Sequence, residues 1–264
     1  MTTVFGLIDR KIRQAFSDAA MHYDVLTSLH KEIGRELIRR VALSRESPWI
    51  ADIGMGTGWL TNRLTVLFPD ARVVGLDFAG GMIDAARSQW EGFHIVEAHA
   101  GRLPFRKDTF DAVVSNLAYQ WVGDLPAAFQ QCREILKKEG TLNITMFGYN
   151  TFEELFASFE QSRGASGRPL PLRRLADEKG VAESLRGAGF RDVCVEREKI
   201  RTHFPDMMAL MKWIQSIGAN NLLADDVYIG KNWLQKAGEY YNDTFHDRWG
   251  VRATFEVIWV EAKK

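Results

Sequence analysis

Residues 52–58, Asp-Ile-Gly-Met-Gly-Thr-Gly, form a glycine-rich turn that follows a predicted strand and opens a predicted helix. Glycine lets a backbone turn tightly and approach a ligand where a Cβ would collide. The amides at the start of the following helix favour a polar or negatively charged group. A dinucleotide fingerprint would place its third glycine at position 59, which is Trp59. The turn therefore indicates a cofactor site and weighs against a nicotinamide dinucleotide.

Asp77 ends the next predicted strand, where a carboxylate can accept hydrogen bonds from both hydroxyls of a ribose. Phe78 follows it and can pack on the face of a purine. A helix N-cap is the alternative role for Asp77, although Gly80 and Gly81 intervene before the helix. For Asp52, the alternative is a solvated strand end.

These groups need a sheet that brings strand ends together, and the chain predicts one. Short apolar runs alternate with helical periodicity: strands are expected at 49–53, 72–77, 93–98, 110–115 and 141–147, and helices at 60–67, 81–90 and 125–136. Such alternation predicts an α/β fold with a mostly parallel sheet and helices on both faces. Open sheets of this kind bind ligands at the carboxyl ends of their strands.

Helical segments flank this region on both sides. Residues 9–43 have the periodicity of two helices that break near Tyr23 and Asp24, and helices are expected at 152–159, 175–188, 207–217 and 233–249. Further strands are expected at 193–200 and 251–260. We interpret residues 1–264 as one domain, with an N-terminal helical lid at 1–45, a sheet core at 46–203 and 250–264, and a helical insertion at 204–249.

Composition narrows the function classes. The 264 residues hold 34 Lys plus Arg and 34 Asp plus Glu, and this zero net charge argues against a nucleic-acid partner. No run approaches the roughly 18 apolar residues of a membrane span, and no signal peptide is visible, so we expect a cytoplasmic protein without membrane attachment. Cys132 and Cys194 predict neither a disulfide framework nor a metal site, and we expect both thiols to be buried.

Segments 52–58, 75–78, 80–87, 103–105 and 110–116 resemble, in order and spacing, the motifs of the class I S-adenosylmethionine-dependent methyltransferases. The resemblance covers residues 49–148 closely. It implies a Rossmann-like, seven-stranded sheet whose last strand is antiparallel, and S-adenosyl-L-methionine as the cofactor.

The same resemblance assigns cofactor contacts by position. Gly54, Gly56 and Gly58 would cradle the methionine part of the cofactor, and Asp52 would lie near its amino group. Asp77 would bind the ribose. The expected adenine neighbours are Phe78, Met82, His99 and Ala100, and His99 stands where many members have an Asp.

Looser motifs at 13–24, 115–122, 147–155 and 217–220 resemble one subfamily, the malonyl-acyl carrier protein O-methyltransferases of biotin synthesis. That resemblance spans nearly the whole chain. It implies an enzyme that esterifies the free carboxylate of a malonyl thioester on acyl carrier protein. One alternative is a methyltransferase acting on another small molecule, for which His22 or His203 would have to serve as a base beside the sulfonium. Another is a protein that binds the cofactor without transferring the methyl group.

A malonyl carboxylate is ionised at neutral pH, because its pKa is near the roughly 4 of side-chain carboxyls, so it must be held rather than activated. Candidate acceptor residues are Tyr23 in the lid and Asn116, Tyr119, Gln120 and Trp121 after the fourth strand. Guanidinium groups suit a carboxylate. Arg173 and Arg174, with Arg163 and Arg168 nearby, are candidates for the malonyl carboxylate or for an acidic carrier surface. The alternative is a solvated basic loop.

Overall fold

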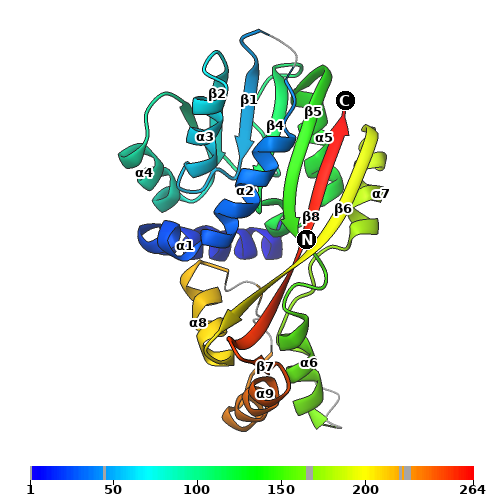
Figure 1. The fold of residues 1–264 in the computed structure, drawn as a ribbon. Helices are drawn as coiled ribbons and strands as arrows, with labels where there is room; N and C mark the ends of the chain where they lie inside the picture. Colours follow the sequence, from blue (N-terminus) through cyan, green and yellow to red (C-terminus); the bar gives the residue numbers. More distant parts are fainter. Residues whose placement is uncertain (1, 44–45, 165–168, 220–221, 223–226) are drawn as a thin grey trace.

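The computed structural model of the chain describes residues 2–43, 46–164, 169–219, 222 and 227–264 (Figure 1). The helices are α1 (Thr2–Leu26), α2 (Ser28–Arg40), α3 (Trp59–Leu67), α4 (Gly80–Gln89), α5 (Leu125–Ile135), α6 (Glu153–Ser162), α7 (Glu178–Gly187), α8 (Met207–Ser216) and α9 (Lys231–Thr244). The strands are β1 (Trp49–Ile53), β2 (Arg72–Asp77), β3 (His94–Glu97), β4 (Phe110–Asn116), β5 (Leu136–Phe147), β6 (Arg191–Phe204), β7 (His246–Asp247) and β8 (Gly250–Lys263). Among the described helices, none is both long and apolar enough to cross a membrane.

The strands form one sheet in the order β3-β2-β1-β4-β5-β8-β6, with the two-residue β7 paired to β8. Strands β1 to β5 run parallel to one another, and β8 runs antiparallel to both β5 and β6. The predicted α/β fold, with its mostly parallel sheet and antiparallel last strand, is therefore confirmed.

Helices cover both faces because the strands alternate their apolar side chains. Ile50 of β1 belongs to a core that includes Leu37 of α2 and Leu64 of α3, whereas Ala51 belongs to a second core with Phe129 of α5. Three helices begin at an aspartate whose carboxylate accepts a hydrogen bond from a backbone N–H: Asp124 for α5, Asp177 for α7 and Asp206 for α8.

The two cysteines differ in burial. Cys132 lies in the second core, but Cys194 is exposed, so the expectation of two buried thiols was wrong for Cys194.

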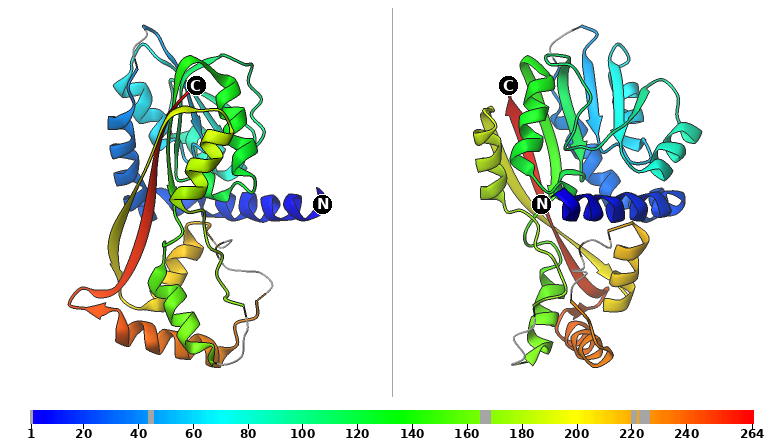
Figure 2. Two further views of the ribbon diagram at one scale, coloured as in Figure 1. Left: turned by 90° about the vertical axis from the view of Figure 1, so that its right-hand side faces the viewer. Right: turned by 180° about the vertical axis from the view of Figure 1, so that it is seen from behind.

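Helix α1 lies across the edge of the sheet at which the parallel strands end (Figures 1 and 2). Helix α1 packs closely on α4: a Cβ on Gly81 of α4 would collide with the backbone of Ser17 of α1. An ion pair between Arg13 and Glu97 joins it to β3. The first helix ends at Leu26 rather than near Tyr23, which leaves Tyr23 inside the helix.

Strands β6 and β8 extend beyond the rest of the sheet, past α1, to a lower layer that contains α6, α8 and α9 (Figures 1 and 2). They stay paired from Arg191 with Lys263 to Phe204 with Val251. The expected helix at 233–249 was wrong at its end. Helix α9 stops at Thr244, and His246 and Asp247 pair with β8 instead.

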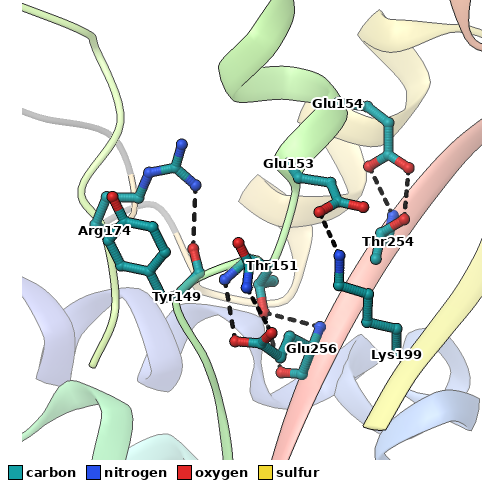
Figure 3. Close-up of polar contacts among 9 residues, drawn as sticks. Tyr149, Thr151, Glu153, Glu154, Arg174, Lys199, Thr254 and Glu256 are labelled. Carbon is teal, nitrogen blue, oxygen red and sulfur yellow. Dashed lines mark hydrogen bonds and ion pairs between the residues drawn. The ribbon is translucent and has the colours of Figure 1, made fainter. Parts of the chain in front are cut away.

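The segment after β5 is fastened to β8 by two buried carboxylates (Figure 3). Glu256 accepts hydrogen bonds from the backbone and side-chain amides of Asn150, at 3.2 and 2.6 Å. Glu154 accepts hydrogen bonds from the backbone N–H of Thr254, at 2.9 Å, and from its hydroxyl. Both carboxylates are almost fully buried. Much of the 147–155 motif therefore secures the chain where it enters the lower layer.

Candidate active site

Three cavities adjoin one another beneath α1. We name them after one residue in each wall: the Asp77 cavity, the Asp52 cavity and the Trp213 cavity. Of the described residues, Tyr23 alone lines all three. Gly54, Gly56 and Asn116 are shared by the first two cavities, and His30 is shared by the second and third. The arrangement is a branched site with Tyr23 at its centre.

The Asp77 cavity opens over the glycine turn. One Asp77 oxygen accepts from the Gly56 amide and the other from the Ala79 amide, both at 2.9 Å. Burial raises the pKa of Asp77, although these amides lower it. An ionised carboxylate has about four acceptor positions, so Asp77 keeps acceptor capacity for a ligand. Ala79, not Asp77, stands at the N-cap of α4.

Gly54 and Gly56 have left-handed backbones, with φ of 75° and 57°. A Cβ on Gly54 would collide with Ala118, whereas one on Gly56 would meet no protein atom within 4 Å. Gly56 therefore borders open space that a ligand can fill. Gly58 does not line the described cavities. It precedes α3 with φ of 81°, and a Cβ there would press on Ala86, Trp90 and Phe93.

Asp52 is fully buried beside the Asp52 cavity. Its Oδ2 accepts a 2.7 Å hydrogen bond from the Thr61 hydroxyl, while its Oδ1 has no partner among the described residues. Burial raises the pKa of Asp52 to about 7, although the Thr61 bond lowers it. A buried acceptor without a donor is costly, so this oxygen is suited to a donor brought by a ligand.

The far wall of the Asp52 cavity comes from the two N-terminal helices. Asp24 accepts a 3.0 Å hydrogen bond from the Thr57 hydroxyl and forms a 3.1 Å ion pair with Lys31. These contacts tie α1 and α2 to the glycine turn.

The outer end of the Asp77 cavity contains Phe78, Met82, His99 and Ala100. Phe78 and His99 meet edge to face, with ring centroids 5.1 Å apart. His99 Nδ1 accepts a 3.0 Å hydrogen bond from the Gly101 amide, and its Nε2 lies 3.7 Å from a carboxylate oxygen of Asp9 in α1. All four residues that were expected near an adenine therefore lie together in one wall.

The Trp213 cavity is largely aromatic and aliphatic. Its wall contains Phe16 and Tyr23 from α1, Gln120 and Trp121 after β4, Phe147, Phe152 and Phe255 from the sheet region, and Trp213, Ile217, Ala219 and Leu222 from the insertion. The predicted acceptor residues Tyr23, Gln120 and Trp121 all border it, and Asn116 borders the two other cavities.

Other candidates lie elsewhere. Tyr119 is fully buried and its hydroxyl lies 2.8 Å from the Cys132 sulfur, so it is a core residue. Arg173 and Arg174 are exposed and belong to none of the three cavity walls. The Arg174 guanidinium lies 3.5 and 4.6 Å from the ring centroids of Phe156 and Tyr149. It also donates a 3.1 Å hydrogen bond to the carbonyl of Tyr149 (Figure 3). Arg168 lies outside the described residues.

The sequence analysis overlooked two wall residues, His30 and Trp213. His30 is buried in the first turns of α2, and Trp213 donates a 2.9 Å hydrogen bond to the carbonyl of Leu26. The only signal for His30 is its helical spacing from Ile33 and Leu37, which places it on the buried face of α2.

The cavities fit S-adenosyl-L-methionine. The Asp77 and Asp52 cavities are continuous along Tyr23, Gly54, Gly56 and Asn116, which line both of them. The unpartnered oxygen of Asp52 suits an amino group, and Asp77 has free acceptor positions for ribose hydroxyls. The open space over Gly56 connects the Asp77 cavity to the Asp52 cavity. The two cavities together accommodate the two ends of the cofactor.

Known proteins agree with this geometry. Residues 51–144 match the family model described as "Methyltransferase domain". The fold is similar to the YcgJ protein of Bacillus subtilis, with a TM-score of 0.61 and 16% identity over 89% of this chain and 98% of that one. It is also similar to a phosphoethanolamine N-methyltransferase of Haemonchus contortus in complex with S-adenosyl-L-methionine, with a TM-score of 0.54 and 18% identity over 88% and 52%.

A curated relative extends over nearly the whole chain. The malonyl-[acyl-carrier protein] O-methyltransferase of Gallionella capsiferriformans is 32% identical over 98% of this chain and 92% of its own length. The chain belongs to the malonyl-[acyl-carrier protein] O-methyltransferase family, within the S-adenosylmethionine-dependent methyltransferases.

Proposed function

We propose that this protein transfers a methyl group from S-adenosyl-L-methionine to the free carboxylate of a malonyl group on acyl carrier protein, as in biotin synthesis. The observation that carries the proposal is the meeting of three cavities at Tyr23. Two of them suit the halves of the cofactor, and the third is left for an acceptor. The relative's name supplies the acceptor.

The cofactor half of the site is assigned to groups on the sheet edge. Asp77 would hold the ribose hydroxyls and Asp52 the amino group. Phe78, Met82, His99 and Ala100 would surround the adenine. Bound S-adenosyl-L-methionine supplies an electrophilic methyl group on a positively charged sulfonium.

The acceptor half is suited to a nucleophile that is already ionised. Burial raises the pKa of Tyr23, and the charges of Asp77 and Asp24 raise it further, so its phenol stays protonated and can donate a hydrogen bond. The apolar wall of the Trp213 cavity excludes water, which increases the reactivity of a carboxylate. Tyr23, Asn116, Gln120 and Trp121 are the residues that we propose to orient it, and orientation alone can supply about 7–11 kcal/mol.

Arg173 and Arg174 are better placed for the carrier than for the reacting carboxylate. Both are exposed, so their charges can meet the acidic surface of a carrier protein. A cytoplasmic location stays a prediction, which cell fractionation would test.

The alternative, a methyltransferase for another small molecule, would need a base beside the methyl group. His22 is exposed on α1, and His203 pairs with Asp247 at 2.9 Å; neither borders the described cavities. The two histidines considered as bases for that alternative therefore lie outside the site.

The test is a methyl-transfer assay with labelled S-adenosyl-L-methionine that offers malonyl-carrier protein, malonyl-coenzyme A and unloaded carrier side by side. Base-labile label on malonyl-carrier protein is expected, because a carboxyl methyl ester hydrolyses in base. A lack of transfer to either malonyl thioester, by protein shown to bind the cofactor, would contradict the proposal.

A further inference from the structure

His30 stands in the wall between the Asp52 cavity and the Trp213 cavity. Its side chain is 8% exposed and lies among three aromatic rings. The ring centroids of Phe147, Tyr23 and Trp213 lie 5.6, 6.0 and 6.2 Å from its own. The imidazole is therefore held in place next to Tyr23, where the three cavities meet.

Neither ring nitrogen of His30 has a hydrogen-bond partner among the described residues, and Nδ1 is shielded from solvent. A neutral imidazole carries one N–H. A proton on Nδ1 would be a buried donor without an acceptor, which proteins avoid. The tautomer with the proton on Nε2 leaves that N–H available to a ligand.

The local environment keeps this imidazole neutral. Burial lowers the pKa of His30 to about 4. Tyr23 keeps its proton, and the remaining described residues of the Trp213 cavity wall carry no charged groups. An acceptor in this cavity thus meets neutral donors on its described walls.

A neutral site suits a reaction in which charge disappears. The carboxylate oxygen forms a bond to the methyl carbon while the bond between that carbon and sulfur breaks. The electron pair of the broken bond stays on sulfur. An anion and a cation thereby become a neutral ester and a neutral thioether, and no proton moves. A fixed cation beside the carboxylate would stabilise the ionised reactant more than the transition state, which would slow the transfer.

We propose that His30 holds the acceptor carboxylate by donating a hydrogen bond from Nε2, so that His30 and Tyr23 form an uncharged carboxylate site. This inference rests on the proposed function. It assigns to the acceptor a residue that the motifs did not indicate.

The test compares three substitutions of His30. In His30→Gln, the side-chain amide reaches about as far as Nε2, whereas in His30→Asn it reaches only about as far as Nδ1; His30→Leu removes the donor. We expect kcat/KM for malonyl-carrier protein to fall roughly ten- to hundred-fold in the Leu and Asn variants, the effect of one lost hydrogen bond to a charged group. The Gln variant should keep most of the activity.

The other readouts separate this role from a structural one. S-adenosylhomocysteine should bind the variants within about threefold of the original protein, and their melting temperatures should not follow the order of their activities. His22→Leu is the matched control, because His22 is exposed, borders none of the three cavities and should not affect turnover.

Equal activity of the Leu, Asn and original proteins would overturn the assignment. Equal losses in the Gln, Asn and Leu variants would also overturn it, because position of the donor would then be irrelevant. If the original protein, with cofactor bound, methylates no malonyl thioester, the proposed function itself fails. That result differs from the one in which the original protein is active and the His30 substitutions have no effect.

Discussion

The side-chain amide of Asn116 donates a 3.0 Å hydrogen bond to the backbone carbonyl of His30, which joins the end of β4 to the start of α2. The Asn116 oxygen accepts a 2.7 Å hydrogen bond from the Thr145 hydroxyl on β5. Asn116 is therefore fixed from two sides and in turn fixes the position of His30. The position of α2 therefore depends on the end of the sheet where Asp52 and Asp77, the proposed cofactor residues, lie.

Replacing Asp52 should change how cofactor binding depends on pH. With its pKa near 7, the carboxyl loses its proton as pH rises from about 6 to about 8 and then attracts an amino group. Affinity of the original protein for S-adenosylhomocysteine should rise over this interval, and in Asp52→Asn it should be weak and nearly flat. Titration calorimetry at several pH values measures this. The charged neighbours Asp77, Asp24 and Lys31 are unchanged in the variant and serve as an internal reference.

The same pKa predicts an effect on stability without ligand. The folded state holds the Asp52 proton up to about pH 7, whereas an unfolded carboxyl loses it near 3.8. The folded state thus binds more protons between these values, and stability falls as pH rises through them. Asp52→Asn should be more stable than the original protein at pH 8, by denaturant titration, even though it binds the cofactor less well. Greater stability of the original protein at pH 8 would contradict the assignment.

Asp77→Ala should weaken cofactor binding by about 1–3 kcal/mol, the scale of lost hydrogen bonds to a charged group. Asp77 also organises the glycine turn through the Gly56 amide, so the melting temperature of each variant must be measured alongside affinity. Asp84→Ala is the control, because Asp84 is an exposed residue of the adjacent helix α4. An unchanged binding isotherm for Asp77→Ala would rule out the ribose assignment.

Two glycines of the turn should respond differently to alanine. Gly54→Ala brings a Cβ against Ala118 and should destabilise the fold beyond the about 1 kcal/mol cost of a left-handed alanine. Gly56→Ala places its Cβ in open space, so it should cost about that 1 kcal/mol and yet reduce cofactor affinity at least tenfold. Thermal unfolding and binding, measured on both variants, separate the two effects. Full affinity in Gly56→Ala would show that no ligand occupies this space.

Tyr23→Phe should reduce turnover more than cofactor binding. The change removes one protonated donor from the point where the cavities meet, and roughly a tenfold loss of kcat is expected. Single-turnover methylation and a binding titration provide the two numbers. Tyr228→Phe, at an exposed tyrosine, is the control and should leave both unchanged. A loss confined to cofactor affinity would instead assign Tyr23 to the cofactor alone.

The exposed arginines should affect the carrier and not the chemistry. Replacing both Arg173 and Arg174 by alanine should raise KM for malonyl-carrier protein roughly two- to fivefold, with a smaller effect at high salt. Malonyl-pantetheine, which has no protein surface, should react at an unchanged rate. Arg106→Ala is the control, because Arg106 is exposed and lies before the amino end of β4, whereas the candidate site lies at the carboxyl ends of the strands. Equal losses on both substrates would place these arginines at the reacting carboxylate instead.

Features encoded in neighbouring residues were predictable from the sequence. The glycine turn and Asp77 are local, because left-handed φ angles and strand ends leave their mark on a few adjacent residues. The alternation of strands and helices likewise predicted the parallel sheet. Spacing did not distinguish Gly56, which borders the cavity, from Gly58, which packs against Trp90.

Features formed by distant segments were not predictable. His30 and Trp213 meet in space although they come from different helices. The periodicity of 233–249 continues past Thr244, but pairing with β8 converts its end to a strand. Arg173 and Arg174 have the right chemistry for a carboxylate, yet their chain segment places them at the surface. In each example the structure depends on contacts between residues that are distant in the sequence. The local residue pattern does not reveal such contacts.

The long antiparallel pair of β6 and β8 separates two parts of the candidate site. The glycine turn, Asp52 and Asp77 lie on β1, β2 and the loops that follow them, whereas Trp213, Ile217 and Leu222 lie in the segment that connects β6 to β8. Substitutions in this connecting segment can reshape the proposed acceptor wall without changing a residue that we propose to hold the cofactor. Acceptor preference can therefore diversify in evolution while the source of the methyl group stays the same.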